Sequence, residues 1–433
     1  MRPKGIKTIQ DFSQAMRESR DARLRMCGSL LEGGNPASAD VGGLQRILRS
    51  LESIPLRGGR RTLAYDGKSL SLDLSYEIGE LEKDLLYLAG GEEALLDHLA
   101  GLHPGFAAEL EAGRAFLAEA PREFLSFVTD RDGTVNNYCG RYYSSIQSVY
   151  NAVFLTRFAR RRCGRAVILT SAPLEEGGLV DVSVVPPGNF VLAGSKGREA
   201  LDEQGRRHRL PIPAEQQAAL DRLNHGLARL LEQPEFEIFG LVGSGLQFKF
   251  GQSTVAHQDV YGSIPTDLSR RFRESVATLI LELDPGGKSF RTEDTGKDLE
   301  ILLTVSDTGR SDEMAPAGGT GPADGTVGDG NESARRSGGD GLRDFDKGDG
   351  VRFLDRTLGL HLDRGPNLVC GDTPSDLPMI EAATRTGGET WSIFITRDNS
   401  LREEVRTACP QSWFASKPDI LVALLNELGR EKR

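Results

Sequence analysis

Apolar residues recur at helical spacing through the first 120 positions of the chain. One such stripe consists of Leu44, Ile47, Leu48, Leu51 and Ile54. Residues three and four positions apart share one face of an α-helix, so this stripe predicts an amphipathic helix. The segment 80–102 has the same pattern around a Gly-Gly break at 90–91. We therefore predict a helical region over 1–120, and we expect it to serve packing, self-association or contact with a protein partner.

The pattern changes at residue 124, where short apolar runs begin to alternate with amphipathic stretches. The runs 124–129 (FLSFVT) and 166–170 (AVILT) predict buried strands, and 144–161 predicts a helix between them, capped by Ser144 or Ser145. Strand–helix–strand order indicates a parallel α/β sheet. The same style returns near the C-terminus, with a helix at 351–360, strands at 367–371 and 391–396, and a last helix at 419–428.

Residues 186–345 separate these two halves and follow a different pattern. Strands are predicted at 236–250 and 299–305, and 266–283 predicts a helix followed by a strand. The segment 306–342 is rich in Gly, Asp and Ser and has almost no bulky apolar residue, so we predict a flexible insertion there. The fold class is α/β, a parallel-sheet core split by an inserted α+β unit. The predicted divisions are 1–120, 121–185, 186–345 and 346–433.

Composition narrows the class of protein. Of the 433 residues, 27% are charged and 38% hydrophobic, and no apolar run approaches the roughly 18 residues of a membrane helix. The N-terminal segment contains no apolar leader, and the five scattered cysteines form no CxxC pair. We therefore expect a reduced, cytoplasmic protein that does not bind membranes. The net charge of −10 argues against nucleic acid as a partner.

Polar residues stand directly beside four of the predicted core elements. Asp130 and Asp132 end one strand, Thr170 and Ser171 end another, Lys347 precedes a helix, and GDTPSD (371–376) follows a third strand. The carboxyl ends of parallel strands meet at one edge of a sheet, so we expect these groups to converge. Mg²⁺ prefers such carboxylate oxygens and substrate phosphate as ligands.

This set of groups is suited to phosphoryl transfer. Asp130 and Asp372, from separate strands, can hold the metal, and an aspartate can attack phosphorus. A second carboxyl two residues further on lies on the same side of an extended chain, where it can protonate the leaving oxygen and later activate water. Lys347 and the hydroxyl of Thr170 or Ser171 can bind the transferring phosphoryl oxygens.

The order Asp-x-Asp-Gly-Thr, Ser/Thr, Lys and Gly-Asp-x-x-x-Asp resembles the haloacid dehalogenase superfamily of phosphatases. The resemblance covers about 121–433 in outline. It implies that Asp130 is the nucleophile and a Mg²⁺ ligand, and that Asp132 is the general acid and base with its backbone carbonyl on the metal. It implies phosphate-binding roles for Lys347 and for Thr170 in preference to Ser171. It further implies that Asp372 is a metal ligand and that Asp376 supports the metal shell.

An insertion between the second and third motifs is similar to the C2 class of cap in this superfamily. The stretch GLQFKFGQSTVAHQ (245–258), followed by FDKGDGVRFLD (345–355), resembles the trehalose-6-phosphate phosphatases. That resemblance implies sugar contacts from Lys249, His257 and Glu300. The chain departs from the family pattern in its second motif, where TSAP (170–173) replaces Ser-Gly-Arg, and in a fourth motif closer to the general C2 form.

The sequence therefore predicts a Mg²⁺-dependent phosphatase acting on a small phosphorylated sugar, with trehalose 6-phosphate as the first candidate. Sucrose phosphate, glucosylglycerol phosphate and mannosyl-phosphoglycerate would need a similar cap and remain alternatives. A non-catalytic regulatory or scaffold protein, acting through the N-terminal region and the glycine-rich insertion, is the alternative of another class. That alternative predicts a catalytic site that lacks one or more of its charged groups.

Overall fold

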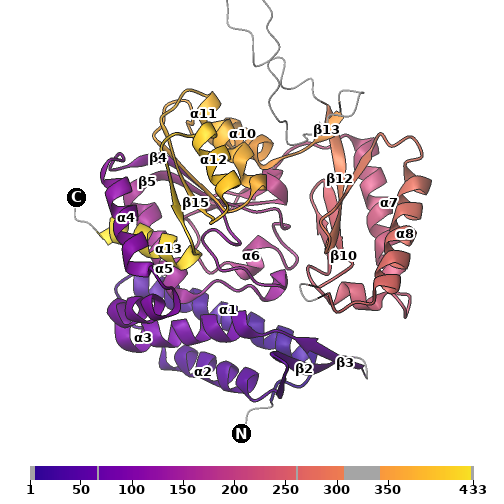
Figure 1. The fold of residues 1–433 in the computed structure, drawn as a ribbon, viewed down its shortest axis with the longest axis horizontal. Coiled ribbons are helices and arrows are strands. Elements are labelled where there is room, and N and C mark those ends of the chain that lie inside the picture. Colours follow the sequence, from indigo (N-terminus) through magenta and orange to yellow (C-terminus); the bar gives the residue numbers. More distant parts are fainter. Residues whose placement is uncertain (1–4, 66–67, 260–261, 307–341, 431–433) are drawn as a thin grey trace, which may run out of the picture.

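The computed structural model describes residues 5–65, 68–259, 262–306 and 342–430. The chain forms three parts: an N-terminal unit, a core around one large sheet, and a cap built on a second sheet. In Figure 1 the N-terminal unit lies below the core and the cap lies to its right. The predicted flexible insertion lies almost entirely outside the described residues.

The N-terminal unit combines helices with a small sheet. Its elements are α1 (Ile9–Leu31), α2 (Ser38–Glu52), α3 (Ser75–Leu102) and the antiparallel strands β1 (Leu56–Arg57), β2 (Arg60–Tyr65) and β3 (Lys68–Leu72). A capping box between Thr8 and Asp11 starts α1. The prediction of an all-helical region missed the three strands, because they are short and strongly polar. Among those of their side chains that the structure describes, only Leu63 and Leu72 are buried and apolar. The double glycine lies inside α3, where Gly91 has a φ of 75° and kinks the helix.

The core is an eight-stranded sheet in the order β16-β15-β14-β4-β5-β6-β7-β8. Neighbouring strands are parallel from β16 to β6, and β7 and β8 add antiparallel pairs at one edge. The strands are β4 (Phe124–Asp130), β5 (Cys163–Leu169), β6 (Val191–Gly194), β7 (Glu199–Leu201), β8 (Arg207–Arg209), β14 (Asn367–Gly371), β15 (Thr390–Ile395) and β16 (Ser412–Ala415).

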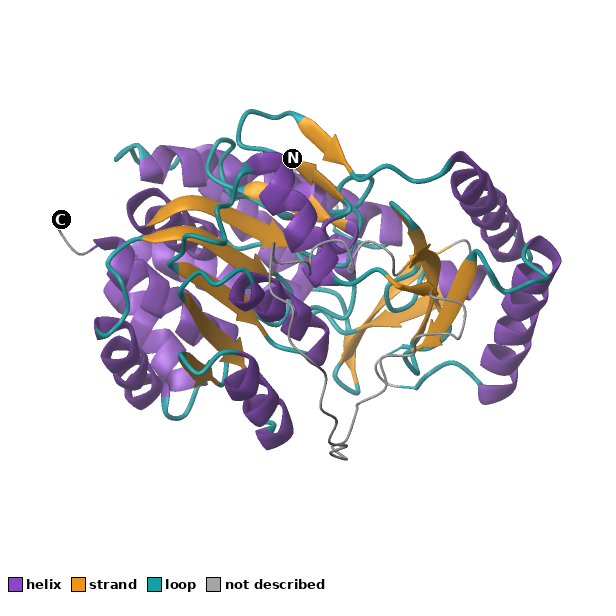
Figure 2. Cartoon of the chain, turned by 90° about the horizontal axis from the view of Figure 1, so that it is seen from above, coloured by secondary structure: helices purple, strands orange, loops and turns teal. Residues whose placement is uncertain are grey.

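Helices cover both faces of this sheet, as Figure 2 shows. The helices on one face are α4 (Phe106–Ala118), α5 (Val149–Arg162) and α13 (Pro418–Arg430), which share a hydrophobic core with the N-terminal unit. The helices on the other are α10 (Lys347–Leu358), α11 (Leu377–Arg385) and α12 (Asn399–Ala408). Short elements complete the core: α6 (Leu179–Val182), η1 (Tyr142–Ser144), η2 (Ser195–Gly197) and η4 (Pro374–Asp376). The predicted parallel α/β core is present.

Two predicted boundaries differ from the structure. The strands β6 to β8, within 191–209, pair with the core sheet, so the inserted unit starts near residue 210 and not at 186. These strands are only three or four residues long, shorter than the apolar runs from which the other core strands were predicted. The helix predicted from 144 begins at Val149, with Ser148 as its N-cap. Ser144 caps nothing there, because its hydroxyl is bound to Glu77 of α3 at 2.7 Å.

The cap is an antiparallel sheet with two helices on one face. Its strands run in the order β11-β12-β10-β9, and β13 pairs with β12. The elements are α7 (Ala214–Leu231), η3 (Glu237–Gly240), β9 (Leu246–Lys249), β10 (Gln252–Ala256), α8 (Thr266–Leu283), β11 (Phe290–Asp294), β12 (Asp298–Ser306) and β13 (Leu342–Asp344). The strand predicted at 236–250 is therefore a 3₁₀ turn followed by a short strand, and 266–283 is helical throughout.

Only one face of the cap sheet is apolar and covered by α7 and α8. Val255 and Ile301 point into that cluster with Phe239 and Phe272, whose rings stack at 4.2 Å. The opposite face looks toward the core (Figure 1). Among the described residues, no helix is both long and apolar enough to cross a lipid bilayer.

Close packing of α13 on α5 generates a stability prediction. A Cβ added at Gly429 would lie 2.8 Å from the backbone nitrogen of Phe158. We expect Gly429→Ala to lower the free energy of unfolding by about 1–3 kcal/mol in urea titrations, because backbone must move. The matched control is Gly101→Ala in α3, where a Cβ meets nothing within 4 Å and the change should be neutral or stabilising by up to about 1 kcal/mol. Equal stabilities would contradict the packing argument.

Candidate active site

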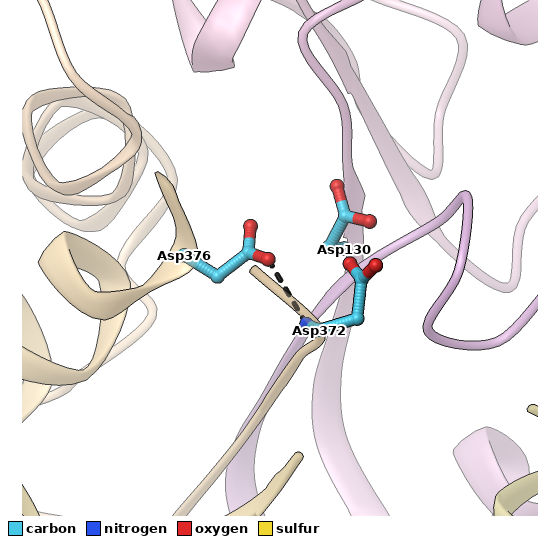
Figure 3. A group of neighbouring side chains, drawn as sticks. All are labelled: Asp130, Asp372 and Asp376. Atoms are coloured by element: carbon cyan, nitrogen blue, oxygen red, sulfur yellow. Dashed lines mark hydrogen bonds between the residues drawn. The ribbon is translucent and has the colours of Figure 1, made fainter. Parts of the chain in front are cut away.

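Two neighbouring parallel strands bring the acidic residues together at one edge of the core sheet. Asp130 is the last residue of β4, and Asp372 follows β14, which pairs with β4 in register Thr129 to Cys370. Asp376 lies in η4, just after β14. One carboxylate oxygen from each of Asp130, Asp372 and Asp376 lies within 4.8 Å of the others (Figure 3).

Lys347 supplies the cation that faces this group. Its Nζ lies 2.5 Å from Oδ1 of Asp130 and 2.5 Å from Oδ1 of Asp376, and the side chain is buried. Lys347 is the first residue of α10, and a capping box between Asp346 and Asp349 fixes the start of that helix. Although burial alone would lower its pKa, the two carboxylates raise the pKa of Lys347, so the ammonium form is held.

Backbone donors orient Asp376. The amides of Asp372 and Thr373 both donate to its Oδ2 at 3.0 Å, and the first of these bonds is drawn in Figure 3. The other carboxylate oxygen is thereby left for Lys347. Asp376 therefore contacts both Lys347 and the turn that carries Asp372.

The turn after Asp130 allows a close approach to Asp372. Gly133 has a φ of 90°, and a Cβ there would lie 2.2 Å from Oδ2 of Asp372. The next residue, Thr134, donates its hydroxyl to Asp372 Oδ1 at 3.1 Å, with Asp130 Oδ2 at 3.4 Å. Sequence reasoning gave Thr134 no role of its own, although it stands inside the Asp-x-Asp-Gly-Thr motif.

Burial and mutual repulsion perturb the carboxylates of this group. Burial raises the pKa of Asp130 from 3.8 to about 7, with Asp376 adding to the rise and Lys347 opposing it. Burial, Asp130 and Asp376 raise the pKa of Asp372 to about 8. One ammonium does not balance three carboxylates. A hard divalent cation with oxygen ligands would, and so the donor set fits Mg²⁺.

The remaining core candidates lie around this group. Asp132 is outside the trio, and its carboxylate is paired with the buried Arg131. Burial raises the pKa of Asp132, which favours its protonated form. Thr170 is buried and follows Leu169, the register partner of Asp130. Its hydroxyl accepts a hydrogen bond from the Ala172 amide at 3.2 Å. Ser171, the next residue, is half-buried.

The polar face of the cap sheet carries two of the three predicted sugar contacts. Directly opposed residues of antiparallel strands share one face, and Lys249 opposes Gln252 while Glu300 opposes Thr254. Glu300 reaches Lys196 of η2 at 3.5 Å, which shows that this face meets the core. Burial lowers the pKa of Lys249, and Glu300 opposes that shift.

The structure does not bring His257 to this face. Its two ring nitrogens lie 2.9 Å from Ser269 of α8 and 2.9 Å from Asp294 of β11, so it belongs to the helix-covered side. Sequence reasoning missed Lys196 instead. Lys196 lies in a turn and has a φ of 60°. A single lysine after a short strand is not a sequence pattern that predicts contact with the cap.

A parallel sheet whose strands end in these charged residues, with a cap inserted in the chain between β8 and α10, defines a protein of the haloacid dehalogenase superfamily. The family model of the C-terminal part of trehalose-6-phosphate phosphatases matches residues 127–318 and 334–421. The family model of their N-terminal helical bundle domain matches residues 8–100. The chain belongs to the trehalose-6-phosphate phosphatase family.

Individual relatives agree with this membership. The chain is 31% identical to alpha,alpha-trehalose-phosphate synthase [UDP-forming] 2 of Caenorhabditis elegans over 98% of its length, but it spans only 34% of that protein. It is 29% identical to a trehalose-phosphatase of Brugia malayi, covering 98% of this chain and 87% of that one. The solved C-terminal domain of a C. albicans trehalose-6-phosphate phosphatase aligns with 74% of this chain and 96% of that chain at 12% identity and a TM-score of 0.43, which adds nothing to the assignment.

The raised pKa values of Asp130 and Asp372 predict a pH-dependent effect of metal. Between about pH 4 and pH 8 the folded protein keeps protons that the unfolded chain has released, so this pair destabilises the fold as pH rises. Mg²⁺ competes with those protons. We expect Mg²⁺, compared with chelator, to raise Tm more at about pH 8.5 than at about pH 6 in thermal unfolding. Asp372→Asn should reduce this difference, and equal shifts at both pH values would contradict the prediction.

Proposed function

We propose that this protein hydrolyses trehalose 6-phosphate to trehalose and inorganic phosphate. The observation that carries the proposal is the contact of Lys347 with both Asp130 and Asp376, beside Asp372, at the carboxyl ends of β4 and β14. Family membership supports trehalose 6-phosphate as the substrate. The Brugia malayi relative named trehalose-phosphatase supports it too, because the match covers 87% of that protein.

In the first half of the proposed reaction, Asp130 attacks phosphorus. A new bond forms between its carboxylate oxygen and phosphorus while the bond from phosphorus to the sugar oxygen breaks. Asp132 gives its proton to the leaving sugar oxygen, a role for which its raised pKa suits it. Lys347 and Thr170 hold the phosphoryl oxygens, and Lys347 aims Asp130 and favours its ionised form against the effect of burial.

In the second half, water cleaves the aspartyl-phosphate. Asp132, now ionised, takes a proton from water as its oxygen bonds to phosphorus, and the bond to Asp130 breaks to release phosphate. The scheme needs Asp132 to move between Arg131 and the reacting oxygens. The same carboxyl therefore serves as acid and then as base.

We further propose that Mg²⁺ is held by the carboxylates of Asp130 and Asp372 and the backbone carbonyl of Asp132. Asp376 would support this shell through the amide of Asp372. When bound, the metal neutralises charge on the phosphoryl group and on its nucleophile.

The cap is the proposed source of sugar specificity. Lys249 offers an ammonium and Glu300 a carboxylate, which suit the hydroxyl groups of a disaccharide. Both lie on the face that meets the core. Sucrose phosphate, glucosylglycerol phosphate and mannosyl-phosphoglycerate are the alternatives. A non-catalytic scaffold is disfavoured, because the site retains every charged group that the chemistry requires.

A panel of these four sugar phosphates tests the proposal. We expect phosphate release from trehalose 6-phosphate in the presence of Mg²⁺ and its loss with chelator. Asp130→Asn should lower kcat by at least about 10³-fold while leaving Tm within a few degrees, because the amide cannot attack phosphorus. Release by Asp130→Asn at the wild-type rate would refute the nucleophile assignment. Release from a different member of the panel would refute the substrate.

Sugar recognition by the cap is tested separately. We expect Lys249→Met and Glu300→Gln to raise KM for trehalose 6-phosphate about tenfold or more with a much smaller change in kcat, because each removes a hydrogen bond to a sugar hydroxyl. His257→Gln is the matched control from the other face of the same sheet, and KM should not change. An equal rise in KM for His257→Gln would show that the cap acts through its fold and not through these contacts.

A further inference from the structure

We propose that helix α3 of the N-terminal unit is part of the catalytic scaffold, and that Tyr76 on it is a positioning residue for the loop carrying Asp132. The inference rests on the proposed function and adds to it a role for the N-terminal unit. The loop concerned, residues 131–137, is called the catalytic loop below.

Asn136 closes the turn of the catalytic loop. Its backbone carbonyl accepts from the Gly133 amide at 2.8 Å, and its own amide donates to the Arg131 carbonyl at 2.9 Å. A β-bridge joins it to Asp132. The turn that presents Asp132, Gly133 and Thr134 to the metal and phosphate groups therefore depends on where Asn136 lies.

Tyr76 fixes that position from α3. Its hydroxyl accepts a hydrogen bond from Nδ2 of Asn136 at 3.0 Å and donates to the carbonyl of Ile146 at 3.1 Å. Tyr76 therefore ties the closing residue of the catalytic loop to the segment that leads into α5. Sixty residues separate Tyr76 from Asn136 in sequence, so the bond links two units of the fold.

A second anchor holds the next residue of the loop. Asn137 donates from Nδ2 to Glu80 Oε1 at 3.1 Å and to Asp419 Oδ1 at 2.9 Å. Lys83 lies between the two carboxylates, 2.5 Å from Glu80 and 3.2 Å from Asp419. Helix α3, the catalytic loop and α13 thus meet in one buried network.

The same face of α3 continues beyond the loop. Glu77 accepts from Arg141 at 2.5 Å and from Ser144 at 2.7 Å, and Asp84 accepts from the amide of Val149 at 2.6 Å, in the first turn of α5. Residues 77, 80, 83 and 84 are all buried, at 5% exposure or less. This face of α3 that packs on the core is therefore charged.

Attaching a helix through buried charged residues costs free energy, because the charges lose their hydration. Well-packed apolar residues give equal or greater stability, whereas buried polar networks fix one geometry. Most partners of this face lie on the catalytic loop and on the segment from it to the first turn of α5; the others include Arg23 of α1 and Asp419 of α13. We infer that this face of α3 holds the catalytic loop in one geometry. That geometry matters because misplacement of a catalytic group by about 1 Å can lower the rate up to about 100-fold.

The test compares two tyrosines of α3 in the full chain. Tyr76→Phe removes the hydroxyl that holds Asn136, and we expect kcat to fall about tenfold or more with KM and Tm little changed. Tyr87→Phe makes the same chemical change about three turns further along α3, where the ring packs at 5.7 Å on Phe154 of α5, and kcat should stay at the wild-type value. Equal kcat values for the two variants would overturn the inference.

A double-mutant cycle separates positioning from general destabilisation. If Tyr76 acts through Asn136, adding Tyr76→Phe to Asn136→Ala should cost little more in kcat than Asn136→Ala alone. Independent, multiplying losses would overturn the proposed route. Should Tyr76→Phe fail to fold, Glu80→Gln tests the second anchor in the same assay, with the same expected loss of kcat.

Each variant is assayed with trehalose 6-phosphate and with p-nitrophenyl phosphate, which has no sugar. A fall in kcat for both substrates is expected, because the loop serves the phosphoryl group. If the wild type hydrolyses only the aryl ester, the proposed sugar substrate fails, and the comparison of Tyr76 with Tyr87 still decides this inference. If the wild type hydrolyses neither, both proposals fall.

Discussion

The contact of Lys347 with two carboxylates is the interaction on which the arrangement of the core depends. Three aspartates converge there because parallel strands end at one edge, and their charges repel in a buried setting. Lys347 reaches them because the first turn of α10 packs unusually close to its neighbours. A Cβ at Gly348 would lie 2.4 Å from the Pro378 carbonyl oxygen, and one at Gly350 would lie 2.0 Å from that of Lys196. Two glycines beside the lysine are therefore a steric requirement of the site.

The strands of the core and the positions of its charged residues could be predicted from the sequence, because long apolar runs that stop abruptly are strong local signals. A buried strand that stops at polar or charged residues marks one edge of a parallel sheet. Three such strand ends fix the positions of Asp130, Thr170 and Asp372, and the start of α10 fixes Lys347. The prediction failed where strands are short, because a short strand leaves only a weak pattern in the sequence. The strands β6 to β8 are only three or four residues long, and β1 to β3 are mostly polar, so the cap boundary and the N-terminal sheet were missed.

Strand phase explains why the cap was predicted less well than the core. In one unbroken strand, Lys249 and His257 would share a face, because side chains alternate with a period of two. The chain instead turns at Phe250 and Gly251, where Gly251 has a φ of 85°, and Lys249 pairs with Gln252. The tight turn changes the phase, so Lys249 faces the core and His257 faces α8. The pairing of Tyr76 with Asn136 was likewise invisible, because it joins residues that only the fold brings together.

The return of the chain from cap to core has a mechanical consequence. Strand β13 ends in the cap sheet at Asp344, and α10 begins at Lys347, with Phe345 buried under the guanidinium of Arg198 at 4.4 Å. Lys347 thus lies three residues after the last strand of the cap, beside one of the connections between cap and core. Displacement in a rotation grows with distance from its axis. In a rotation of the cap about this connection, α7 and α8 would therefore move much further than Lys347.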